Sequence, residues 1–379
     1  MAEGAPPPLL DPCSASPFLA AYVRELAGAD PPLEMRIHPA DEMYLHELQL
    51  PFHHGSSEAA ALLYFSAGHQ VFRTVEEVVA WRFGGFGAVR SFLDFAGGYG
   101  RFGRFLARRM EPDRVTVAEI DPDGVRFQQD TFGVRGFVSD SDPEALRLDG
   151  SYDVVFASSF FSHLPEERFA GWLARLASLI APGGALIYST HGMHLLQDPK
   201  DPTENGIVFR PVSETTRLDG SEYGTSYVTA EFVRAVTDRV ARPGDRLLAF
   251  PSGLGGYQDL YVLVRPPLPP VLDLKLSRFP AGACDRAEIS ADGVVWAEGW
   301  ALGDAHEPPP EVRLYLANRL AETRPGEGQD GAQRRWAVSF LLSAVGPDDI
   351  VRIEARSARG LSKILILSPM RPYLPASSL

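Results

Sequence analysis

Cysteine is scarce in this sequence. Only two cysteines occur in 379 residues, Cys13 and Cys284, and they lie far apart with no Cys-x-x-Cys pair. Closely spaced cysteines are typical of structural zinc sites, and an even series of them is typical of small disulfide-bonded scaffolds. The sequence therefore argues against both kinds of protein.

Long apolar runs are also missing. No stretch approaches the roughly 18 uncharged apolar residues that a membrane-spanning helix needs. The start, "MAEGAPPPLLDP", has neither the basic nor the apolar part of a secretory signal peptide. We therefore expect a cytoplasmic protein with no membrane partner.

Positive charge is in deficit. The chain has 36 Lys and Arg against 49 Asp and Glu, a net charge of −13, and no basic stripe. Nucleic-acid binders usually carry a cluster of basic residues that neutralises phosphates. The sequence therefore predicts that neither DNA nor RNA is a partner.

The patterns that are present indicate three parts of the chain. Residues 1–75 are expected to form a helical cap. Residues 76–265 alternate short apolar strands with amphipathic helices, which predicts an α/β domain with a mainly parallel sheet. The last part, residues 266–379, begins within the proline-rich "RPPLPP" linker of residues 265–270 and then changes to short runs of period two, which predict an all-β sandwich.

A glycine-rich stretch follows the first strand of the α/β part. Residues 91–107 read "SFLDFAGGYGRFGRFLA". We expect a buried strand, then a turn of closely spaced small residues, and then a helix from Arg101 onward. Small residues let backbone amides approach a ligand closely, and a helix N-terminus adds partial positive charge. The stretch therefore predicts a site for a carboxylate or a phosphate.

Gly98, Gly100 and Gly103 form a literal Gly-x-Gly-x-x-Gly, the dinucleotide fingerprint, but the match alone is weak. The segment "LDFAGGYGR" instead resembles the first motif of the class I S-adenosylmethionine-dependent methyltransferases. The resemblance implies a Rossmann-like fold and makes Asp94, Ala96, Gly97, Gly98 and Gly100 cofactor-binding residues. Ala96 departs from the motif because the family has glycine there, and an alanine at a positive φ angle is strained.

Further motifs of that family follow in order. The resemblance assigns the ribose hydroxyls to Glu119, the adenine face to Ile120, and the adenine amino group to Ser139 and Asp140. The segment "YDVVFASSFFSHLP", which contains Ser158, resembles the fourth motif, and "LARLASLIAPGGALIYST" the helix, turn and strand that follow it. The implied cofactor is S-adenosyl-L-methionine.

A narrower likeness extends outside these motifs. The segments "DEMY", "YFSAG", "FSHL", "STHG" and "GYQDLYVL" together resemble a bacterial methyltransferase subset with an N-terminal helical cap. That likeness places Tyr64 and Gly68 over the cofactor. An equally open alternative is that Tyr64 is a half-buried core aromatic.

Two histidines are candidates for the acceptor side. His163 follows the fourth strand and His191 the fifth, so both should lie at the edge of the sheet where such folds bind ligands. A neutral histidine can take the proton of an acceptor hydroxyl. The alternatives are a packing or capping role for His163 and a loop role for His191. His194 and Arg101 are expected to be surface residues.

The place after the fourth strand lacks the Asn/Asp-Pro-Pro-aromatic turn common in methyltransferases that act on nitrogen. An oxygen acceptor on a small molecule or a glycan is therefore favoured. The competing hypothesis is a non-catalytic cofactor-binding scaffold whose β domain recognises a partner or a carbohydrate. In that domain Trp296 and Trp300 share one face of a strand and are either a sugar platform or core residues.

Overall fold

The structure is a computed structural model of the 379-residue chain. It describes residues 7–28, 31–50, 55–196, 205–212, 218–270, 272–303, 307–316, 319–325, 327–330, 333–344 and 350–369. The chain forms two compact units, one of Val71–Leu276 and one that joins Met1–Gln70 to Ser277–Leu379.

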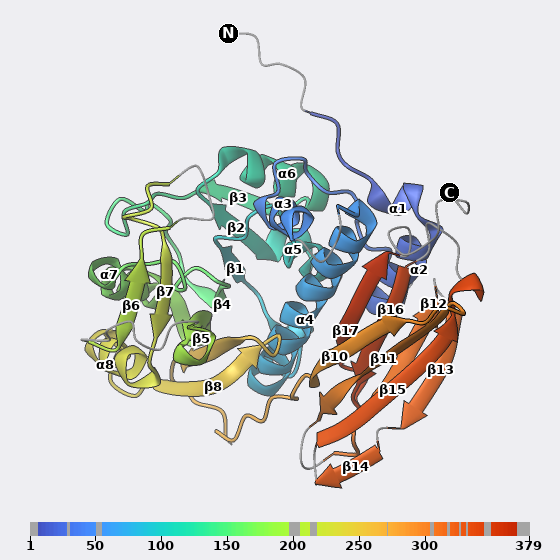
Figure 1. Ribbon diagram of the computed structural model, residues 1–379. Coiled ribbons are helices and arrows are strands. Elements are labelled where there is room, and N and C mark those ends of the chain that lie inside the picture. Colours follow the sequence, from blue (N-terminus) through green and yellow to red (C-terminus); the bar gives the residue numbers. More distant parts are fainter. Residues whose placement is uncertain are drawn as a thin grey trace. The chain divides into compact units, whose positions relative to one another are not determined.

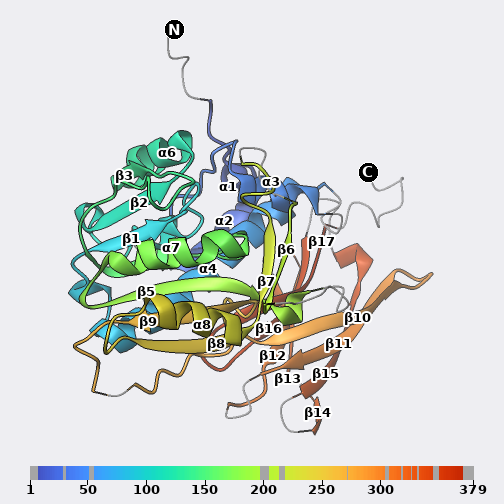
Figure 2. The same cartoon turned by 90° about the vertical axis from the view of Figure 1, so that its left-hand side faces the viewer.

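The Val71–Leu276 unit contains a sheet with the order β3-β2-β1-β4-β5-β9-β8 (Figure 1; β9 is labelled in Figure 2). The strands are β1 Phe92–Phe95, β2 Val115–Glu119, β3 Arg135–Val138, β4 Tyr152–Ala157, β5 Ile180–Gly192, β8 Arg246–Leu254 and β9 Gln258–Val264. The first five are parallel neighbours, and β9 inserts antiparallel between β5 and β8. This arrangement confirms the predicted Rossmann-like methyltransferase sheet.

A small hairpin extends the sheet beside the end of β5. Strands β6 (Ile207–Arg210) and β7 (Thr225–Val228) pair antiparallel, and β7 runs parallel to the last two residues of β5, with His191 opposite Tyr227. The hairpin therefore brings residues 223–228 to the same edge as the carboxyl ends of the parallel strands. The sequence analysis did not predict these two strands.

Helices cover both faces of the sheet, as the alternation of its strands requires. Leu93 and Phe95 of β1 join the core cluster formed with α7 (Glu166–Ser178) and α8 (Ala230–Val240), which lie across one face in Figure 2. Phe92 points to the opposite face, where its ring stacks on Phe102 at a centroid distance of 6.0 Å. That face is covered by the second half of α4 (Ser57–Phe83), α5 (Gly103–Leu106) and α6 (Pro122–Phe132).

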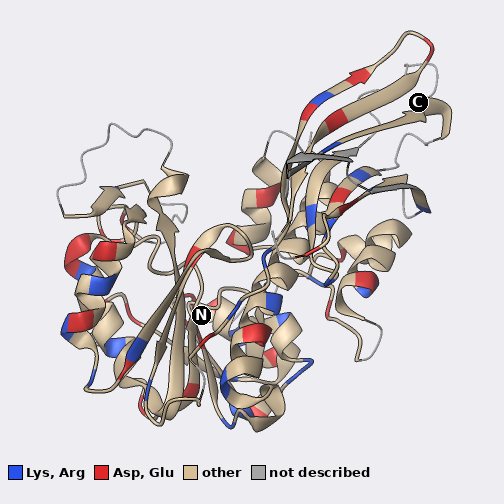
Figure 3. Ribbon diagram, turned by 90° about the horizontal axis from the view of Figure 1, so that it is seen from below, with Lys and Arg blue, Asp and Glu red and all other residues tan. Residues whose placement is uncertain are grey.

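Charge is distributed as this layering predicts. Figure 3 shows Lys, Arg, Asp and Glu mainly on the covering helices, while the strands of the parallel sheet are mostly uncharged. Among the described residues no helix has both the length and the apolarity to span a membrane. The described part of this unit also includes the short 3-10 helices η2 Phe86–Ala88, η3 Pro112–Arg114 and η4 Met193–Leu195.

The second unit contains a sandwich of two four-stranded antiparallel sheets, as predicted. The sheets have the orders β10-β11-β15-β14 and β13-β12-β16-β17. Their strands are β10 Ala281–Ile289, β11 Val294–Leu302, β12 Glu311–Leu316, β13 Arg319–Pro325, β14 Glu327–Asp330, β15 Gln333–Leu341, β16 Ile350–Arg356 and β17 Ser362–Pro369, with the 3-10 helix η5 Leu342–Ala344. Trp336, Val338, Leu314 and Ile353 are among the buried residues between the sheets.

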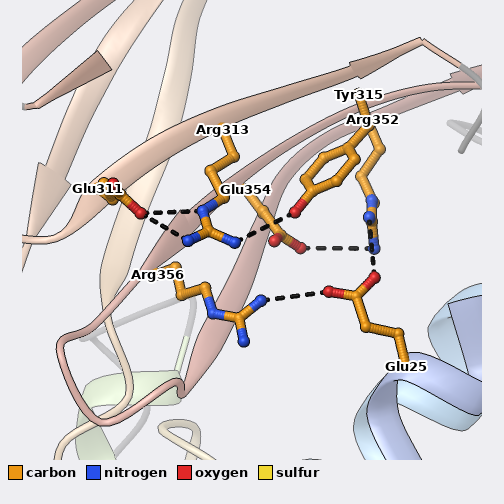
Figure 4. A network of polar contacts seen from close by, with 7 residues as sticks. All are labelled: Glu25, Glu311, Arg313, Tyr315, Arg352, Glu354 and Arg356. Carbon is orange, nitrogen blue, oxygen red and sulfur yellow. Dashed lines mark hydrogen bonds and ion pairs between the residues drawn. The ribbon is translucent and has the colours of Figure 1, made fainter. Parts of the chain in front are cut away.

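The N-terminal helices belong to the same unit as the sandwich. They are α1 Pro12–Ala15, α2 Pro17–Ala27, α3 Glu42–Gln49 and the first half of α4. Arg352 of β16 is only 1% exposed, and its guanidinium lies between the rings of Tyr22 on α2, at 4.4 Å, and Tyr315, at 3.9 Å. Figure 4 shows the surrounding ion pairs, in which Glu25 of α2 contacts both Arg352 and Arg356.

This network explains why the ends of the chain group together. The aromatic rings satisfy a buried cation, and the helix carries its own carboxylate to the sheet. The grouping separates residues 1–70 from the rest of the predicted cap and joins them to the sandwich. The predicted boundaries after residues 75 and 265 stay predictions.

Candidate functional site

The candidate site lies at the carboxyl edge of the parallel strands, where open α/β sheets bind ligands. The loop of residues 96–102 follows β1, Glu119 ends β2, Ser139 follows β3, and Ser158 follows β4. His191 is the second-last residue of β5. The parallel sheet therefore brings together candidates that are spread over nearly 100 positions of the sequence.

The glycine-rich loop has the backbone that its small residues permit. Ala96, Gly98 and Gly100 have φ angles of 55°, 52° and 74°. The positive φ of Ala96 shows that the departure from the family motif is accommodated with strain, which costs on the order of 1 kcal/mol. Residues 96–98 are half-buried whereas Tyr99 and Gly100 are buried, so the loop exposes its first three residues.

Asp94 lies directly beneath this loop. A Cβ added to Gly97 would lie 2.8 Å from Asp94 Oδ2, so only glycine fits against the carboxyl group. That oxygen is buried and has no hydrogen-bond partner among the described residues. Burial raises the pKa of Asp94 to about 8, and the negative charge of Glu119 adds to the shift.

Glu119 is tied to the loop. Its Oε2 accepts a hydrogen bond from the Gly98 N–H at 2.8 Å, and its Oε1 accepts from Ile120 N at 2.8 Å and Asp121 N at 3.1 Å. Burial raises the pKa of Glu119, while these backbone donors oppose the shift. The carboxylate is thus held in one orientation, with its remaining acceptor capacity available to a ligand.

A buried glutamine that the sequence analysis missed holds the loop from below. Gln128 of α6 donates from Nε2 to the carbonyls of Gly97, at 3.3 Å, and Gly98, at 2.9 Å. Its Oε1 would lie 2.7 Å from a Cβ on Gly103, so that glycine is required for close packing of α5 on α6. Only its position on the inner face of an amphipathic helix could have pointed to it.

The helix after the loop is shorter than the sequence predicts. We expected a helix from Arg101, but α5 contains only the four residues Gly103–Leu106 and is flanked by turns. The positive φ of Gly100 delays the start of regular helix. Such a short helix has little macrodipole, so an anionic ligand would depend on the loop amides instead.

The predicted adenine-side residues lie beside Glu119. Ser139 donates its backbone N–H to the Glu119 carbonyl at 2.9 Å, and Ile120 is half-buried next to it. Asp140 is exposed, and its Oδ1 accepts a hydrogen bond from Asp142 N at 3.0 Å in a tight turn. Ser158 is half-buried in the bend after β4.

His163 is fixed by the hairpin. It is 6% exposed, its Nδ1 lies 2.7 Å from the Gly224 carbonyl, and its ring stacks on Tyr223 at 4.7 Å with an interplanar angle of 22°. A carbonyl can only accept, so the Nδ1 atom carries a proton. The basic lone pair of the neutral imidazole is therefore on Nε2.

His191 lies close to His163. The two ring centroids are 6.1 Å apart, with the rings steeply inclined to one another. Tyr227 and Tyr257 flank the other sides of the His191 ring, at 5.5 Å and 6.1 Å. The structure thus brings both predicted histidines together within an aromatic surround that the sequence analysis did not foresee.

A hydrogen-bonded group of side chains that the sequence analysis did not predict connects the end of β4 to β5 and β9. Ser159, with a φ angle of 57°, donates its N–H to Ser189 Oγ at 2.8 Å. The hydroxyls of Ser189 and Ser159 donate to Gln258 Oε1 at 2.6 Å and 3.1 Å. The segment "GYQDLYVL" contained this signal, since its glutamine, Gln258, is the first residue of β9, the strand that pairs with β5.

Tyr64 and Gly68 lie on α4 within the other unit. Tyr64 is fully buried, its hydroxyl donates to Asp41 Oδ2 at 2.5 Å, and its ring packs edge-on against Tyr44. These contacts are those of a core aromatic, the alternative given in the sequence analysis, although the side chain is fully buried and not half-buried. Their predicted place over the cofactor stays a prediction.

Comparison with known proteins bears on the sheet domain. Residues 93–186 match a family model described as a methyltransferase domain. The match begins in β1, ends in β5 and includes the glycine-rich loop, Glu119 and His163. It supports the resemblance to methyltransferases that the motifs indicated.

A curated relative has a similar segment. The malonyl-[acyl-carrier protein] O-methyltransferase of Prosthecochloris aestuarii is 27% identical over 123 residues, which cover 31% of this chain and 45% of that protein. The matched segment therefore spans less than half the length of this relative.

Two solved structures are also similar in part. An O-methyltransferase family protein from Burkholderia thailandensis is 18% identical with a TM-score of 0.38, and the aligned part covers 58% of this chain and 66% of that protein's chain. DesVI from Streptomyces venezuelae is 15% identical with a TM-score of 0.39, and the aligned part covers 55% of this chain and 98% of the DesVI chain.

Proposed function

We propose that this protein is a cytoplasmic S-adenosylmethionine-dependent methyltransferase that methylates a hydroxyl oxygen of a small molecule or glycan. The observation that carries the proposal is the bond between Gly98 N and Glu119 Oε2, which joins the glycine-rich loop to the acid ending β2. The match of residues 93–186 to a methyltransferase domain supports it.

The residues of the loop fit such a cofactor. A Cβ on Gly98 would have no protein atom within 4 Å, so the space above this residue is open to a ligand. The buried, unpartnered Asp94 Oδ2 supplies an acceptor below the loop. Residues 96–100 would hold the amino-acid end of the cofactor and Glu119 its ribose. Ile120, Ser139 and Asp140 would hold the adenine, and Ser158 would also contact the cofactor.

The bound cofactor would supply a methyl group already activated by its sulfonium. The protein then has to place the acceptor oxygen, exclude water and remove the hydroxyl proton. His163 is suited to the last task because its Nε2 carries the lone pair and its orientation is set by Gly224 and Tyr223. The ring centroid of His191 lies 6.1 Å from that of His163. His191 would therefore help to hold the acceptor so that its hydroxyl faces His163.

A carboxylate oxygen is a second candidate acceptor. The observation that favours it is the similarity to a malonyl-[acyl-carrier protein] O-methyltransferase. A carboxylate is already deprotonated at neutral pH and needs no base. The two candidates therefore differ in whether the chemistry of His163 is required.

The test is transfer of a labelled methyl group. The full-length protein is incubated with methyl-labelled S-adenosylmethionine and two sets of acceptors, hydroxylated glycans or phenols and short carboxylic acids. We expect labelled product that survives mild alkali, as ethers do. Label released by alkali would indicate a methyl ester and support the second candidate, while cofactor binding without any product would support the non-catalytic scaffold.

A further inference from the structure

Strand β11 presents two opposite faces of very different character. Ala297, Gly299 and Ala301 are buried, and both alanines belong to the core between the sheets. Side chains alternate along a strand, so Trp296, Glu298 and Trp300 project from the outer face of the β10-β11-β15-β14 sheet. Both tryptophans are half-buried and neither is part of the core cluster. The core alternative for these residues is therefore not what the structure shows.

Each tryptophan has an arginine and an acid beside it on the neighbouring strands. Trp296 lies opposite Glu288, which pairs with Arg286 at 2.7 Å, and the Arg286 guanidinium is 5.7 Å from the Trp296 ring centroid. Trp300 lies opposite Arg335 of β15, which pairs with Asp285 at 2.6 Å. The β-bulge between Cys284 and Arg286 shifts the register of β10 between the two groups.

The same set of groups thus occurs twice along one strand. Each set combines an indole ring with an ion pair that offers both donors and acceptors of hydrogen bonds. The tryptophans are four residues apart, which is roughly 13 Å along a strand. A ligand that contacts both sets must be elongated and offer similar chemistry at intervals, as a polymer does.

The named charges on this face include no unpaired arginine. Two arginines are paired with two acids, and Glu298 between the tryptophans adds a single negative charge. An anionic polymer would find no unpaired basic stripe here. A neutral polyhydroxylated chain matches better, because sugar rings stack their C–H faces on aromatic rings and their hydroxyls bond to paired carboxylates and guanidiniums.

The other outer face of the sandwich shows how this chain buries aromatic groups when it has its own partner for them. There, Tyr22 and Tyr315 are 2% and 5% exposed because α2 packs against Arg352. Trp296 and Trp300 are not buried in this way. We propose that the outer face around Trp296, Glu298 and Trp300 is a binding surface for a neutral polysaccharide.

The test is affinity electrophoresis of the full-length protein in native gels that contain dextran, galactomannan or hydroxyethyl cellulose, with heparin as an anionic comparison. We expect at least one neutral polymer to retard the protein. Trp296→Ala and Trp300→Ala should each weaken the interaction about tenfold, equivalent to about 1.4 kcal/mol. Trp296→Tyr should retain most of it, because a tyrosine ring can still stack.

The matched control is Trp81→Phe, which changes another half-buried tryptophan on α4. It should bind the polymers as the natural protein does. The proposal would be overturned if no neutral polymer retarded the protein or if heparin alone did. It would also be overturned if the neutral polymers retarded the alanine variants as strongly as the natural protein. Both alanine variants should keep the natural affinity for S-adenosylhomocysteine, so this result is independent of the proposed methyl transfer.

Discussion

His163 and Gly224 are joined by two hydrogen bonds that run in opposite directions. The Gly224 N–H donates to the His163 carbonyl at 2.9 Å, and the His163 imidazole donates through Nδ1 to the Gly224 carbonyl at 2.7 Å. The first bond fixes the backbone after β4 to the hairpin, and the second fixes the imidazole ring. The orientation and tautomer of His163 are therefore set before any ligand binds.

Replacement of His163 by alanine tests its role as a base. If a hydroxyl is the acceptor, we expect kcat to fall by about 10²–10⁴, the usual contribution of a positioned base. The affinity for S-adenosylhomocysteine should change less than about twofold, because no cofactor residue is altered. A labelled-methyl assay gives kcat, and calorimetry gives the affinity.

The control for this variant is His46→Ala, an exposed histidine on α3, which should leave kcat unchanged. Restoration of activity at high pH in the His163 variant would support proton removal, since hydroxide replaces the missing base. Full activity of His163→Ala at neutral pH would rule out this role and favour a carboxylate acceptor.

Asp94 should make the stability of the cofactor-free protein depend on pH. Its pKa in the folded chain, about 8, is above the value of 3.8 for an unperturbed aspartate. Between these values the folded state binds more protons than the unfolded state, so stability falls as pH rises from about 4 to 8. The slope from this residue is at most roughly 1.4 kcal/mol per pH unit.

Asp94→Asn removes the titration and keeps the shape of the side chain. The difference in unfolding free energy between the variant and the natural protein should therefore grow in favour of the variant toward pH 8. Urea denaturation at several pH values measures it. Parallel pH profiles for the two proteins would contradict a raised pKa at this position.

Ala96→Gly should relieve the strain of the loop. Because Ala96 has a φ angle of 55°, glycine at this position should stabilise the protein by up to about 1 kcal/mol. Ala107→Gly, where φ is −58°, should destabilise by about 0.5–1 kcal/mol, since the same exchange there only adds freedom to the unfolded chain. Equal effects of the two exchanges would mean that Ala96 is not strained in solution.

Arg352 should stabilise the unit that joins the N-terminal helices to the sandwich. Arg352→Ala leaves Glu354, 2% exposed, without its partner at 3.5 Å and removes the cation between two tyrosine rings. We expect a loss of about 3–5 kcal/mol in unfolding free energy. Denaturant unfolding followed by tryptophan fluorescence measures the loss, in a background where Trp81 and Trp172 of the other unit are replaced by phenylalanine so that the signal comes from this unit.

Arg356→Ala is the matched control, because Arg356 pairs with the same Glu25 but its side chain is 31% exposed. It should cost less than about 1 kcal/mol. A similar small cost for both variants would show that the buried cluster does not hold α2 on the sheet.

The sequence predicted those parts of the fold that local patterns encode. Periodicity and the ordered motifs gave the parallel sheet, the sandwich, and the grouping of Glu119 with the glycine-rich loop. Contacts between distant segments left no such pattern. Gln128, Gln258 and Tyr223 contact residues on other segments of the chain, namely Gly98, Ser189 and His163. The cluster around Arg352 joins residues more than 300 positions apart.

The central claim is that Glu119 and the glycine-rich loop hold S-adenosylmethionine. Calorimetric titration of the full-length protein with S-adenosylmethionine and S-adenosylhomocysteine tests it most directly, alongside Glu119→Gln and the exposed-acid control Glu144→Gln. The account predicts binding of both nucleosides, weakened at least about tenfold by Glu119→Gln and unchanged by Glu144→Gln. Absence of binding to the natural protein, or equal affinity in Glu119→Gln, would contradict it.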